Sequence, residues 1–429
     1  MLLAIKNIFR ALKYRNYRLF FFGQSISLTG TWLQGVASGW LVYRLTNSAL
    51  LLGIVAFASQ VPAFLTSSFA GVIVDRMDKR KILIVTQTLS MLQAFILAFL
   101  VLSGIIQVWE IIVLSVCLGL INAFDMPARQ AFVIRMVENR EDLSNAIALN
   151  SSMVNGARLV GPAIAGIIIA ATGEGMCFLI NALSFIAVII SFFSMKMAAE
   201  KIEKSSKPLL REFKEGLAYA YGSLPIRNLL ILLGLVSLFG MPYAVLMPVF
   251  ARDILRGGPQ TLGFLMSGAG TGALIGAFYL ASRKNVRGLW SLLTVSTAIF
   301  GIGLCLFAFS KIFWLSLLLM PVIGFGMMVQ IAASNTLLQT IVDDDKRGRV
   351  MSLYAMAFMG MAPFGSLFAG SLAHVVTAPG TILISGLACI AGAFVFSRQL
   401  PLIREKVRPL YMELGIMSAS EVMVPPEKA

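Results

Sequence analysis

The stretch Gly71-Val-Ile-Val-Asp75-Arg76-Met-Asp78-Lys79-Arg80-Lys81 joins two long apolar segments through a short run of cations. The segments on either side, residues 50–74 and 82–106, each hold about 25 residues, and about 20 apolar residues suffice for a helix to cross a bilayer. Cations in a short loop between two spans mark the side of the membrane that stays in the cytoplasm. The stretch therefore predicts two spanning helices joined by a cytoplasmic turn.

The same arrangement repeats along the whole chain. If the N-terminus is cytoplasmic, 30 of the 35 Lys and Arg residues fall in segments on the cytoplasmic side. This asymmetry predicts a multi-pass protein of the bacterial inner membrane with both termini in the cytoplasm. We expect an all-α membrane protein whose twelve transmembrane helices cover residues 19–42, 50–74, 82–106, 108–126, 146–171, 177–195, 229–250, 262–281, 289–309, 312–338, 350–375 and 380–396.

The composition argues against several other classes of protein. Hydrophobic residues make up 58% of the chain and charged residues 13%, which leaves too little polar surface to cover a soluble globule. The net charge of +15 sits in short loops beside apolar segments, so it favours anionic lipid headgroups over nucleic acid. The four cysteines and the single histidine, His374, have no metal-ligand spacing, and the sequence has no phosphate-binding loop motif. We therefore expect no enzyme activity, metal, cofactor or nucleic-acid partner.

The two halves of the chain resemble each other weakly. Gly53 and Gly263 open the second and eighth spans and lie 210 residues apart, while Gly166 and Gly370 lie 204 residues apart in the fifth and eleventh spans. With six spans in each half, such matches predict two pseudo-symmetric six-helix bundles around a central cavity. We expect an N-terminal bundle at 1–197, a cytoplasmic linker at 198–227 with a short interfacial helix at 211–221, a C-terminal bundle at 228–400 and a mobile cytoplasmic tail at 401–429.

The first motif lies in the opening stretch. Its pattern, Gly-x-x-x-Asp-Arg-x-x-basic-basic between two spans, resembles motif A of the major facilitator superfamily, although Asp78 stands where that family commonly has Gly. The resemblance implies a cytoplasmic gate, in which Arg80 pairs with Asp125 at the end of the fourth span and Asp75 lies near residues 348–350. An ordinary basic loop, with Asp125 as a solvated helix cap, is the alternative. The expected gating residues are Gly71, Asp75, Arg76, Lys79, Arg80 and Asp125.

A second motif lies in the fifth span, where small residues surround a proline: Gly156, Gly161, Pro162 and Gly166. Glycines permit close helix packing, and a proline inside a helix favours a bend. The segment resembles motif C of the exporter branches of the superfamily, which implies export; generic small-residue packing is the alternative. We expect these residues to pack the fifth helix against the eleventh.

Two longer segments narrow the resemblance. Residues 124–132 (FDMPARQAF) and 347–354 (RGRVMSLY) are similar to the branch of drug and siderophore efflux carriers that includes the enterobactin exporter. That branch implies a monomeric secondary transporter that exports an amphipathic small molecule by alternating access, with proton antiport. A carrier of lysophospholipids or other lipids is the first alternative. A transport-dead receptor or scaffold is the second, because residues 282–285 (SRKN) are a degenerate counterpart of motif A.

The expected substrate cavity is centred on Arg158, the one charge near the middle of a predicted span. An ionisable residue at that depth is a functional candidate; the alternative is an arginine satisfied by carbonyls, Asn150 or Asn155. Because no carboxylate lies at mid-depth in the predicted spans, we expect Arg158 to favour anionic or catechol-like substrates over cations. For the same reason, the expectation of proton coupling rests on the resemblance alone. Other residues expected to line the cavity are Gln24, Trp32, Gln34, Gln60, Asn122, Tyr243, Gln330 and Asn335.

Overall fold

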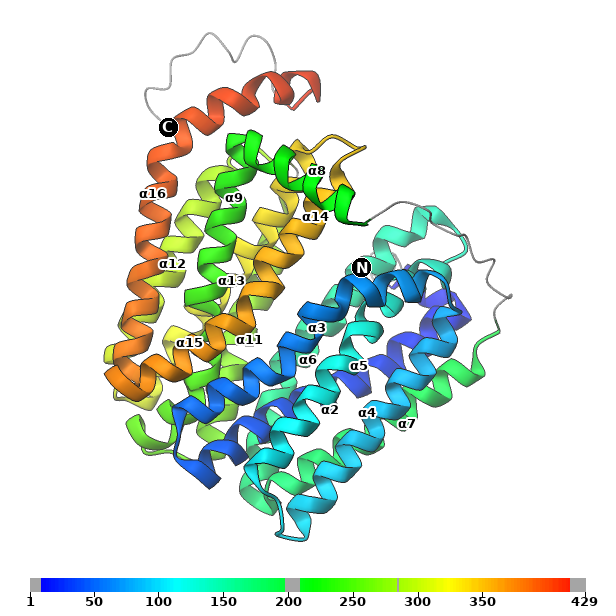
Figure 1. Ribbon diagram of the computed structural model, residues 1–429, viewed down its shortest axis with the longest axis vertical. Helices are drawn as coiled ribbons and strands as arrows, with labels where there is room; N and C mark the ends of the chain where they lie inside the picture. The colour runs from blue at the N-terminus through cyan, green and yellow to red at the C-terminus, as the bar shows by residue number, and fades with distance from the viewer. Residues whose placement is uncertain (1–8, 197–208, 284, 417–429) are drawn as a thin grey trace.

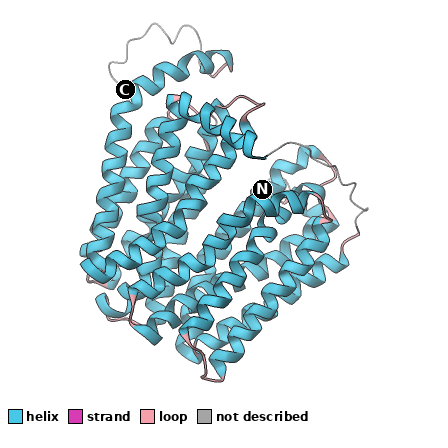
Figure 2. Ribbon diagram, viewed as in Figure 1, coloured by secondary structure: helices cyan, strands magenta, loops and turns pink. Residues whose placement is uncertain are grey.

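The computed structural model describes residues 9–196, 209–283 and 285–416, except the side chains of residues 67, 68, 72, 75, 140 and 209–214. Within these ranges the chain is helical, with short turns between helices (Figures 1 and 2). The first half comprises η1 (Arg10–Lys13), α2 (Arg15–Thr46), α3 (Ala49–Asp75), α4 (Lys79–Leu102), α5 (Val108–Arg135), η2 (Arg140–Asp142), α6 (Leu143–Thr172) and α7 (Glu174–Ser194). The second half comprises α8 (Leu209–Gly222), α9 (Leu224–Leu235), η3 (Val236–Gly240), η4 (Met241–Leu246), α10 (Met247–Val249), η5 (Phe250–Ile254), α11 (Pro259–Ala281), α12 (Leu289–Phe309), α13 (Phe313–Ile341), α14 (Arg347–Ala355), η6 (Met356–Gly360), α15 (Met361–Val376) and α16 (Ala378–Glu413).

Eleven helical runs in the described ranges are long and apolar enough to cross a membrane. The all-helical membrane architecture predicted from the sequence is thus confirmed. The remaining expected span corresponds to α2, which has 32 residues and is therefore long enough. Its composition is less apolar because a row of buried polar residues, including Gln24, Ser27 and Gln34, follows one face of the helix. Such a face fits a helix that turns polar groups away from lipid.

Two predicted helix ends are wrong. The fourth span was expected to end at Met126, but α5 continues through Pro127 to Arg135, because residues beyond the proline, among them Phe132, still bury against the first half. The twelfth was expected to end at Phe396 before a mobile tail, but α16 continues to Glu413. The extension stays helical because an apolar row is buried against the second half, comprising Ile403, Val407 and Tyr411.

The segment between the halves contains the expected short helix, α8. Most of the expected linker that precedes it, residues 197–208, lies outside the described residues. Glu215 of α8 forms an ion pair of 3.1 Å with Arg349 of α14, and the Tyr219 hydroxyl donates a hydrogen bond of 3.1 Å to Asp343. The helix therefore lies against the start of α14 and the turn that precedes it.

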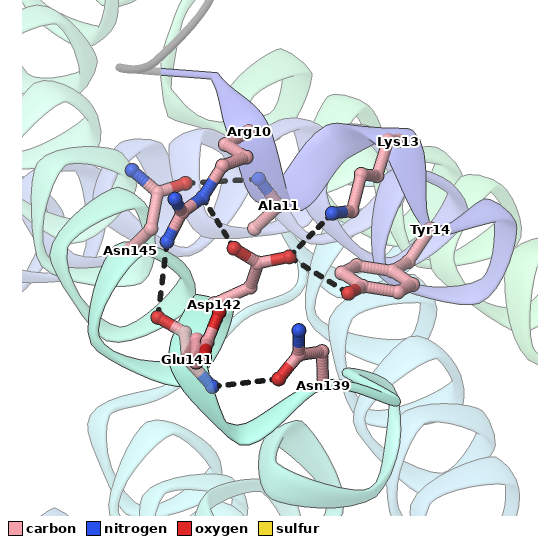
Figure 3. A network of polar contacts seen from close by, with 8 residues as sticks. All are labelled: Arg10, Ala11, Lys13, Tyr14, Asn139, Glu141, Asp142 and Asn145. Carbon is pink, nitrogen blue, oxygen red and sulfur yellow. Dashed lines mark hydrogen bonds and ion pairs between the residues drawn. The ribbon is translucent and has the colours of Figure 1, made fainter.

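The first described residues are fastened to the loop between α5 and α6 (Figure 3). The buried Asp142 carboxylate pairs with Arg10 and, at 2.6 Å, with Lys13, and it accepts a hydrogen bond of 2.7 Å from Tyr14. The hydrogen bond from Lys13 is the main cause that lowers the pKa of Asp142 below its usual range. Two cations that the sequence assigned only to the orientation of the protein thus also hold its N-terminal segment.

Successive helices run in opposite directions, so the turns fall into two sets. We call the end of the molecule that holds the start of α2 and the end of α16 the terminal face; its turns are 76–78, 136–142, 282–288 and 342–346. We call the other end the opposite face; its turns are 47–48, 103–107, 173, 255–258, 310–312 and 377. Figure 1 shows the ribbons of the two halves converging towards the opposite face and diverging towards the terminal face.

Near the opposite face, α3 crosses α15 and α6 crosses α11 at glycines. A Cβ atom on Gly53 would lie 2.6 Å from a carbonyl oxygen of α15 and 3.0 Å from Cα of Gly370. A Cβ atom on Gly166 would lie 2.6 Å from a carbonyl oxygen of α11 and 3.2 Å from Cα of Gly263. The backbones can approach this closely only because both crossings are built from glycine.

The pairing of these crossings differs from the expected one. The fifth span was expected to pack against the eleventh, but α6 meets α11, the eighth, and α3 meets α15. In the repeat, α3 corresponds to α11 and α6 corresponds to α15. A two-fold axis between the halves that brings α3 onto α15 also brings α11, the equivalent of α3, onto α6, the equivalent of α15. Each of these helices therefore packs against a helix of the other half that is not its own equivalent. The four glycines that marked the repeat are the residues in contact.

The second motif therefore serves two different contacts. Gly161 faces its own half, because a Cβ atom there would lie 2.5 Å from Cβ of Trp32 on α2. Gly166 faces the other half, and the Pro162 carbonyl oxygen would lie 2.4 Å from a Cβ atom on Gly263. Gly156 has no atom within 4 Å of its Cβ position. The expected role of Gly161 against the eleventh helix is wrong.

Replacement of Gly166 by alanine should destabilise this conformation, whereas Gly156→Ala on the same helix should not. The added methyl of Gly166→Ala meets backbone atoms that no rotamer change can move, so a cost of about 1–3 kcal/mol is expected. Gly156→Ala adds a methyl in open space and raises helix propensity. Thermal unfolding of both purified variants in one detergent measures the difference. Equal Tm values would contradict the close contact.

Candidate substrate and gating sites

Polar contacts join the two halves at the opposite face. The Tyr43 hydroxyl at the end of α2 donates a short hydrogen bond to the carboxylate of Asp253. Arg252 donates a hydrogen bond of 2.7 Å to the Asn47 side-chain oxygen and lies 5.8 Å from the centre of the Tyr43 ring. These groups, which the sequence did not single out as a gate, lie at the same end as the glycine crossings. Together they hold the halves shut at this face.

Arg158 lies on α6 between the two halves. One guanidinium nitrogen lies 3.8 Å from the sulfur of Met327 on α13 in the second half. The guanidinium also lies 5.8 Å from the centre of the Trp32 ring on α2, within the range of a cation–π contact. No described carboxylate pairs with Arg158. The charge is therefore met by one thioether and one aromatic ring, which are weak partners for a guanidinium.

Two of the residues expected in the substrate cavity, Arg158 and Trp32, come together here. A third, Tyr243 of η4 in the second half, is buried with its ring 6.2 Å from that of Phe300 in an edge-on arrangement. Arg158 and Trp32 can therefore present a fixed cation beside an aromatic wall.

Three other expected residues, Gln24, Gln34 and Asn122, line a separate polar cavity in the first half. It has a volume of about 380 Å³, lies mainly among α2, α3, α4 and α5, and is bounded towards the second half by η4, α10 and α11. Most of its polar groups are uncharged. Besides the three expected residues they are Ser27, Thr31, Ser38, Ser59, Gln87, Ser90, Gln93, Ser115 and Asn181.

A chain of amides fixes one wall of this cavity. Asn181 of α7 donates a hydrogen bond of 2.7 Å to Gln34, whose own amide nitrogen donates one of 3.1 Å to Gln93 on α4. Sequence reasoning found Gln34 but missed its partners. The signal was present, because Gln87, Ser90 and Gln93 recur at helical spacing within one predicted span and so share a face.

Asp125 is the buried carboxylate of the cavity. It is 2% exposed and lies within α5, about ten residues before the helix ends. It accepts hydrogen bonds from Thr86 at 2.9 Å and from Gln87 at 2.7 Å, and it pairs with Arg129 at 2.6 Å. The expectation that it closes the fourth span is therefore wrong, and so is the alternative of a solvated helix cap. The continuation of the helix through Pro127 explains why.

The expected pair between Arg80 and Asp125 is not formed. Arg80 instead donates hydrogen bonds of 2.8 and 3.1 Å to the backbone carbonyls of Phe192 and Phe193. These carbonyls end α7, where the helix dipole favours a cation. Arg129 stands closer to Asp125 along its own helix and takes its place as partner.

The other residues of the first motif take different positions. Asp78, the departure from the family pattern, caps α4 by accepting hydrogen bonds from the backbone N–H groups of Arg80 and Lys81, a favoured role for aspartate. Arg76 is exposed and Lys79 is buried. Gly71 has no atom within 4 Å of its Cβ position. The side chain of Asp75 lies outside the described residues, so its expected contact stays a prediction.

Three expected cavity residues lie elsewhere. Gln60 donates a hydrogen bond of 3.1 Å to a carbonyl of its own helix, and Asn335 accepts one of 2.7 Å from Gln339 on the same helix. Gln330 is completely buried in α13. None of them lines the polar cavity of the first half.

The chain is similar to curated transporters over most of its length. A staphyloferrin A transporter of Staphylococcus aureus is 28% identical over 379 residues, which are 88% of this chain and 94% of that protein. The multidrug efflux pump Tap of Mycolicibacterium fortuitum is 26% identical, with 82% of this chain and 88% of that protein covered. The macrolide efflux protein A of Streptococcus pyogenes is 22% identical, with 88% and 96% covered.

Solved structures share the fold, and a family match covers nearly the whole chain. The nucleoside transporter NupG has a TM-score of 0.68 at 14% identity, covering 91% of this chain and 99% of that one. An inward-facing bacterial homologue of the iron transporter ferroportin also scores 0.68, at 16% identity, with 90% and 98% covered. Residues 7–411 match the family described as transmembrane secretion effector. The chain therefore belongs to the transmembrane secretion effector family of the major facilitator superfamily, a group of transporters and not of enzymes.

Proposed function

We propose that this protein exports an amphipathic, siderophore- or drug-like small molecule across the bacterial inner membrane by alternating access, in exchange for protons. Relatives named for staphyloferrin A transport and for multidrug efflux support this substrate range. The observation that carries the proposal is the position of Arg158, a guanidinium between the two halves with only a thioether and an aromatic ring as partners. A ligand bound there touches both halves at once.

The orientation follows from the distribution of charge. Most of the cations in the sequence lie in or beside the turns of the terminal face, or in the N-terminal, linking and C-terminal segments, so the positive-inside bias assigns this face to the cytoplasm. In that orientation the glycine crossings and the Tyr43–Asp253 hydrogen bond close the side away from the cytoplasm. This is the conformation that an exporter needs when it takes up substrate from the cytoplasm.

The chemistry of Arg158 favours oxygen-rich anions. Burying a guanidinium costs free energy unless hydrogen-bond acceptors meet it, and neither Met327 nor Trp32 supplies an oxygen. A carboxylate or catecholate can accept two parallel hydrogen bonds from the forked donors of the guanidinium. A cationic ligand would instead add repulsion.

Asp125 is the proposed carrier of the coupling proton. It is a buried carboxylate held by one cation, Arg129, and by two neutral donors, Thr86 and Gln87. If the Arg129 side chain rotates away from Asp125 during the transport cycle, the buried charge loses its compensation and a proton can take the place of the cation. Re-formation of the pair would release the proton. Asp125 would thus act as the buried carboxylate that we did not find at mid-depth in any span predicted from the sequence.

Arg158→Gln should weaken binding of 2,3-dihydroxybenzoate, an anionic catechol, by about 10- to 100-fold, because a hydrogen bond to a charged group contributes about 1.5–3 kcal/mol. Arg158→Lys should keep part of the affinity, because the charge remains although the fork is lost. Calorimetric titration of the purified protein measures both variants.

The control for this experiment is Arg18→Gln, an exposed arginine of the terminal face. Arg44 is a poorer control because its partner Glu174, at 2.6 Å, is buried and would be left with an unpaired charge. If tetraphenylphosphonium binds more tightly than the catechol, and more tightly still to Arg158→Gln, Arg158 is no substrate site.

Asp125→Asn should abolish transport driven by a pH gradient while retaining substrate exchange at equal pH, because the amide cannot bind and release a proton. Flux of a fluorescent efflux substrate in proteoliposomes, with and without a gradient, separates these two activities. Asp344→Asn, at an exposed ion pair with Arg347, is the matched control. Gradient-driven flux of normal size in Asp125→Asn would exclude this residue as the carrier. No flux in the wild type, for siderophores, drugs and lysolipids alike, would favour the scaffold alternative.

Asp75→Asn should sharply reduce transport without affecting insertion, if Asp75 meets the start of α14 when the cytoplasmic side closes. At the start of α14, Arg349 is paired with Glu215 of α8. Alkylation of a cysteine placed at Asn122, in the polar cavity, should become faster in this variant when substrate is present. Unchanged flux in a correctly inserted protein would remove the first motif from the gate.

A further inference from the structure

The polar cavity of the first half has features of a ligand site separate from Arg158. Two glutamine side chains that line it, Gln24 and Gln87, are 2% and 4% exposed. No described residue donates a hydrogen bond to the amide oxygen of either one. A buried acceptor without a donor costs free energy. A donor that enters the cavity and hydrogen-bonds to either oxygen therefore removes that cost.

The orientation of the Gln87 amide is fixed by its neighbour. Its nitrogen donates a hydrogen bond of 2.7 Å to the Asp125 carboxylate. If the amide were rotated by half a turn, its oxygen would face the carboxylate oxygen, and two acceptors would repel each other. The oxygen of Gln87 therefore remains the free atom, and what it requires from a ligand is a donor.

The charge of the cavity favours an uncharged ligand over a cation. Among the residues that line it, the carboxylate of Asp125 and the guanidinium of Arg129 lie 2.6 Å apart and compensate each other. A metal cation or an ammonium group near Gln87 would meet a carboxylate already neutralised and a guanidinium that repels it. A hydroxyl group donates to an amide oxygen without that penalty, and the serines of the wall can hydrogen-bond to further hydroxyls.

The size of the cavity suits a small molecule or one part of a larger one. Its volume of about 380 Å³ lies within the range of about 300–1,000 Å³ that is typical of ligand pockets. We infer that this cavity binds a small, uncharged, hydroxyl-rich molecule, or the hydroxyl-rich part of a larger substrate, through hydrogen bonds donated to the amide oxygens of Gln24 and Gln87. The inference does not depend on the Arg158 site.

Thermal unfolding of the full-length protein in lipid nanodiscs tests this inference, with erythritol, xylitol, sorbitol and myo-inositol at 50 mM each. Polyols are excluded from protein surfaces and raise the Tm of most proteins, so the comparison needs a variant with the cavity obstructed. Gly35 lines the cavity and has no atom within 4 Å of its Cβ position. Gly35→Leu therefore adds a side chain that starts in open space at the cavity wall, obstructs part of the cavity and provides the reference for the non-specific shift.

At least one polyol should raise the Tm of the wild type by about 2 °C or more beyond its effect on Gly35→Leu. Gln87→Met keeps the length of the side chain and removes the amide, while Asp125 retains its contacts with Thr86 and Arg129. The extra shift in Tm should therefore be absent in Gln87→Met as well. Should Gly35→Leu fail to fold, Gln87→Met provides the comparison.

Equal shifts in the wild type and in the variants, for all four polyols, would overturn the inference and leave a cavity that holds only water. A larger extra shift with putrescine or sodium chloride than with any polyol would also overturn it, in favour of a cation site. Because the polyols are uncharged and the variants used for comparison keep Arg158, neither result bears on Arg158, and loss of catechol binding in Arg158→Gln does not bear on the polyols.

Discussion

Close contact between backbones at two glycine crossings governs the architecture of this protein. Where α3 meets α15 and α6 meets α11, a single methyl group would collide with main-chain atoms of the facing helix. The contact brings both halves together near one face, where Tyr43 and Asp253 can then reach each other. Arg158 lies on the same helix as Gly166, about two turns away, and the crossing thereby positions its guanidinium beside Met327 of the other half.

The two halves contribute unequally to the interior. In the first half, the polar faces of α2, α4 and α5 point inward and enclose a cavity with a buried carboxylate. In the second half, the helical runs Leu224–Ile254 and Arg347–Val376 are interrupted by the wider turns η3 and η6, where the Ser237 hydroxyl donates a hydrogen bond to the Phe358 carbonyl. Such turns free carbonyl groups and often occur at functional sites. The first half thus carries most of the polar chemistry, and the second carries the irregular helices.

Sequence reasoning predicted the features that follow from composition and repetition. Runs of apolar residues and the one-sided cations predict a multi-pass helical protein, because the bilayer sets the length of each span. Gly53, Gly263, Gly166 and Gly370 were found as a repeat, yet their partners were not, since a pattern in one dimension does not say which copy meets which. Asp125 was misplaced because Pro127 and the polar residues after it resemble a helix end. Thr86 and Gln87 could not be predicted as its partners, because they meet Asp125 only through packing of α4 on α5. Arg129 lies four residues further along α5, a spacing that the sequence does show.

The central claim is that the contacts at the opposite face open when those of the terminal face close. Electron paramagnetic resonance distances between spin labels test it directly, in a protein whose native cysteines are replaced. One pair would report the terminal face, Ile134→Cys on α5 with Thr336→Cys on α13, and a second pair the opposite face, Leu45→Cys with Lys311→Cys; all four positions are exposed. On addition of transported substrate at low pH, the first distance should shorten and the second should lengthen. Two distances that stay constant, or that change in the same direction, would contradict alternating access about the glycine crossings.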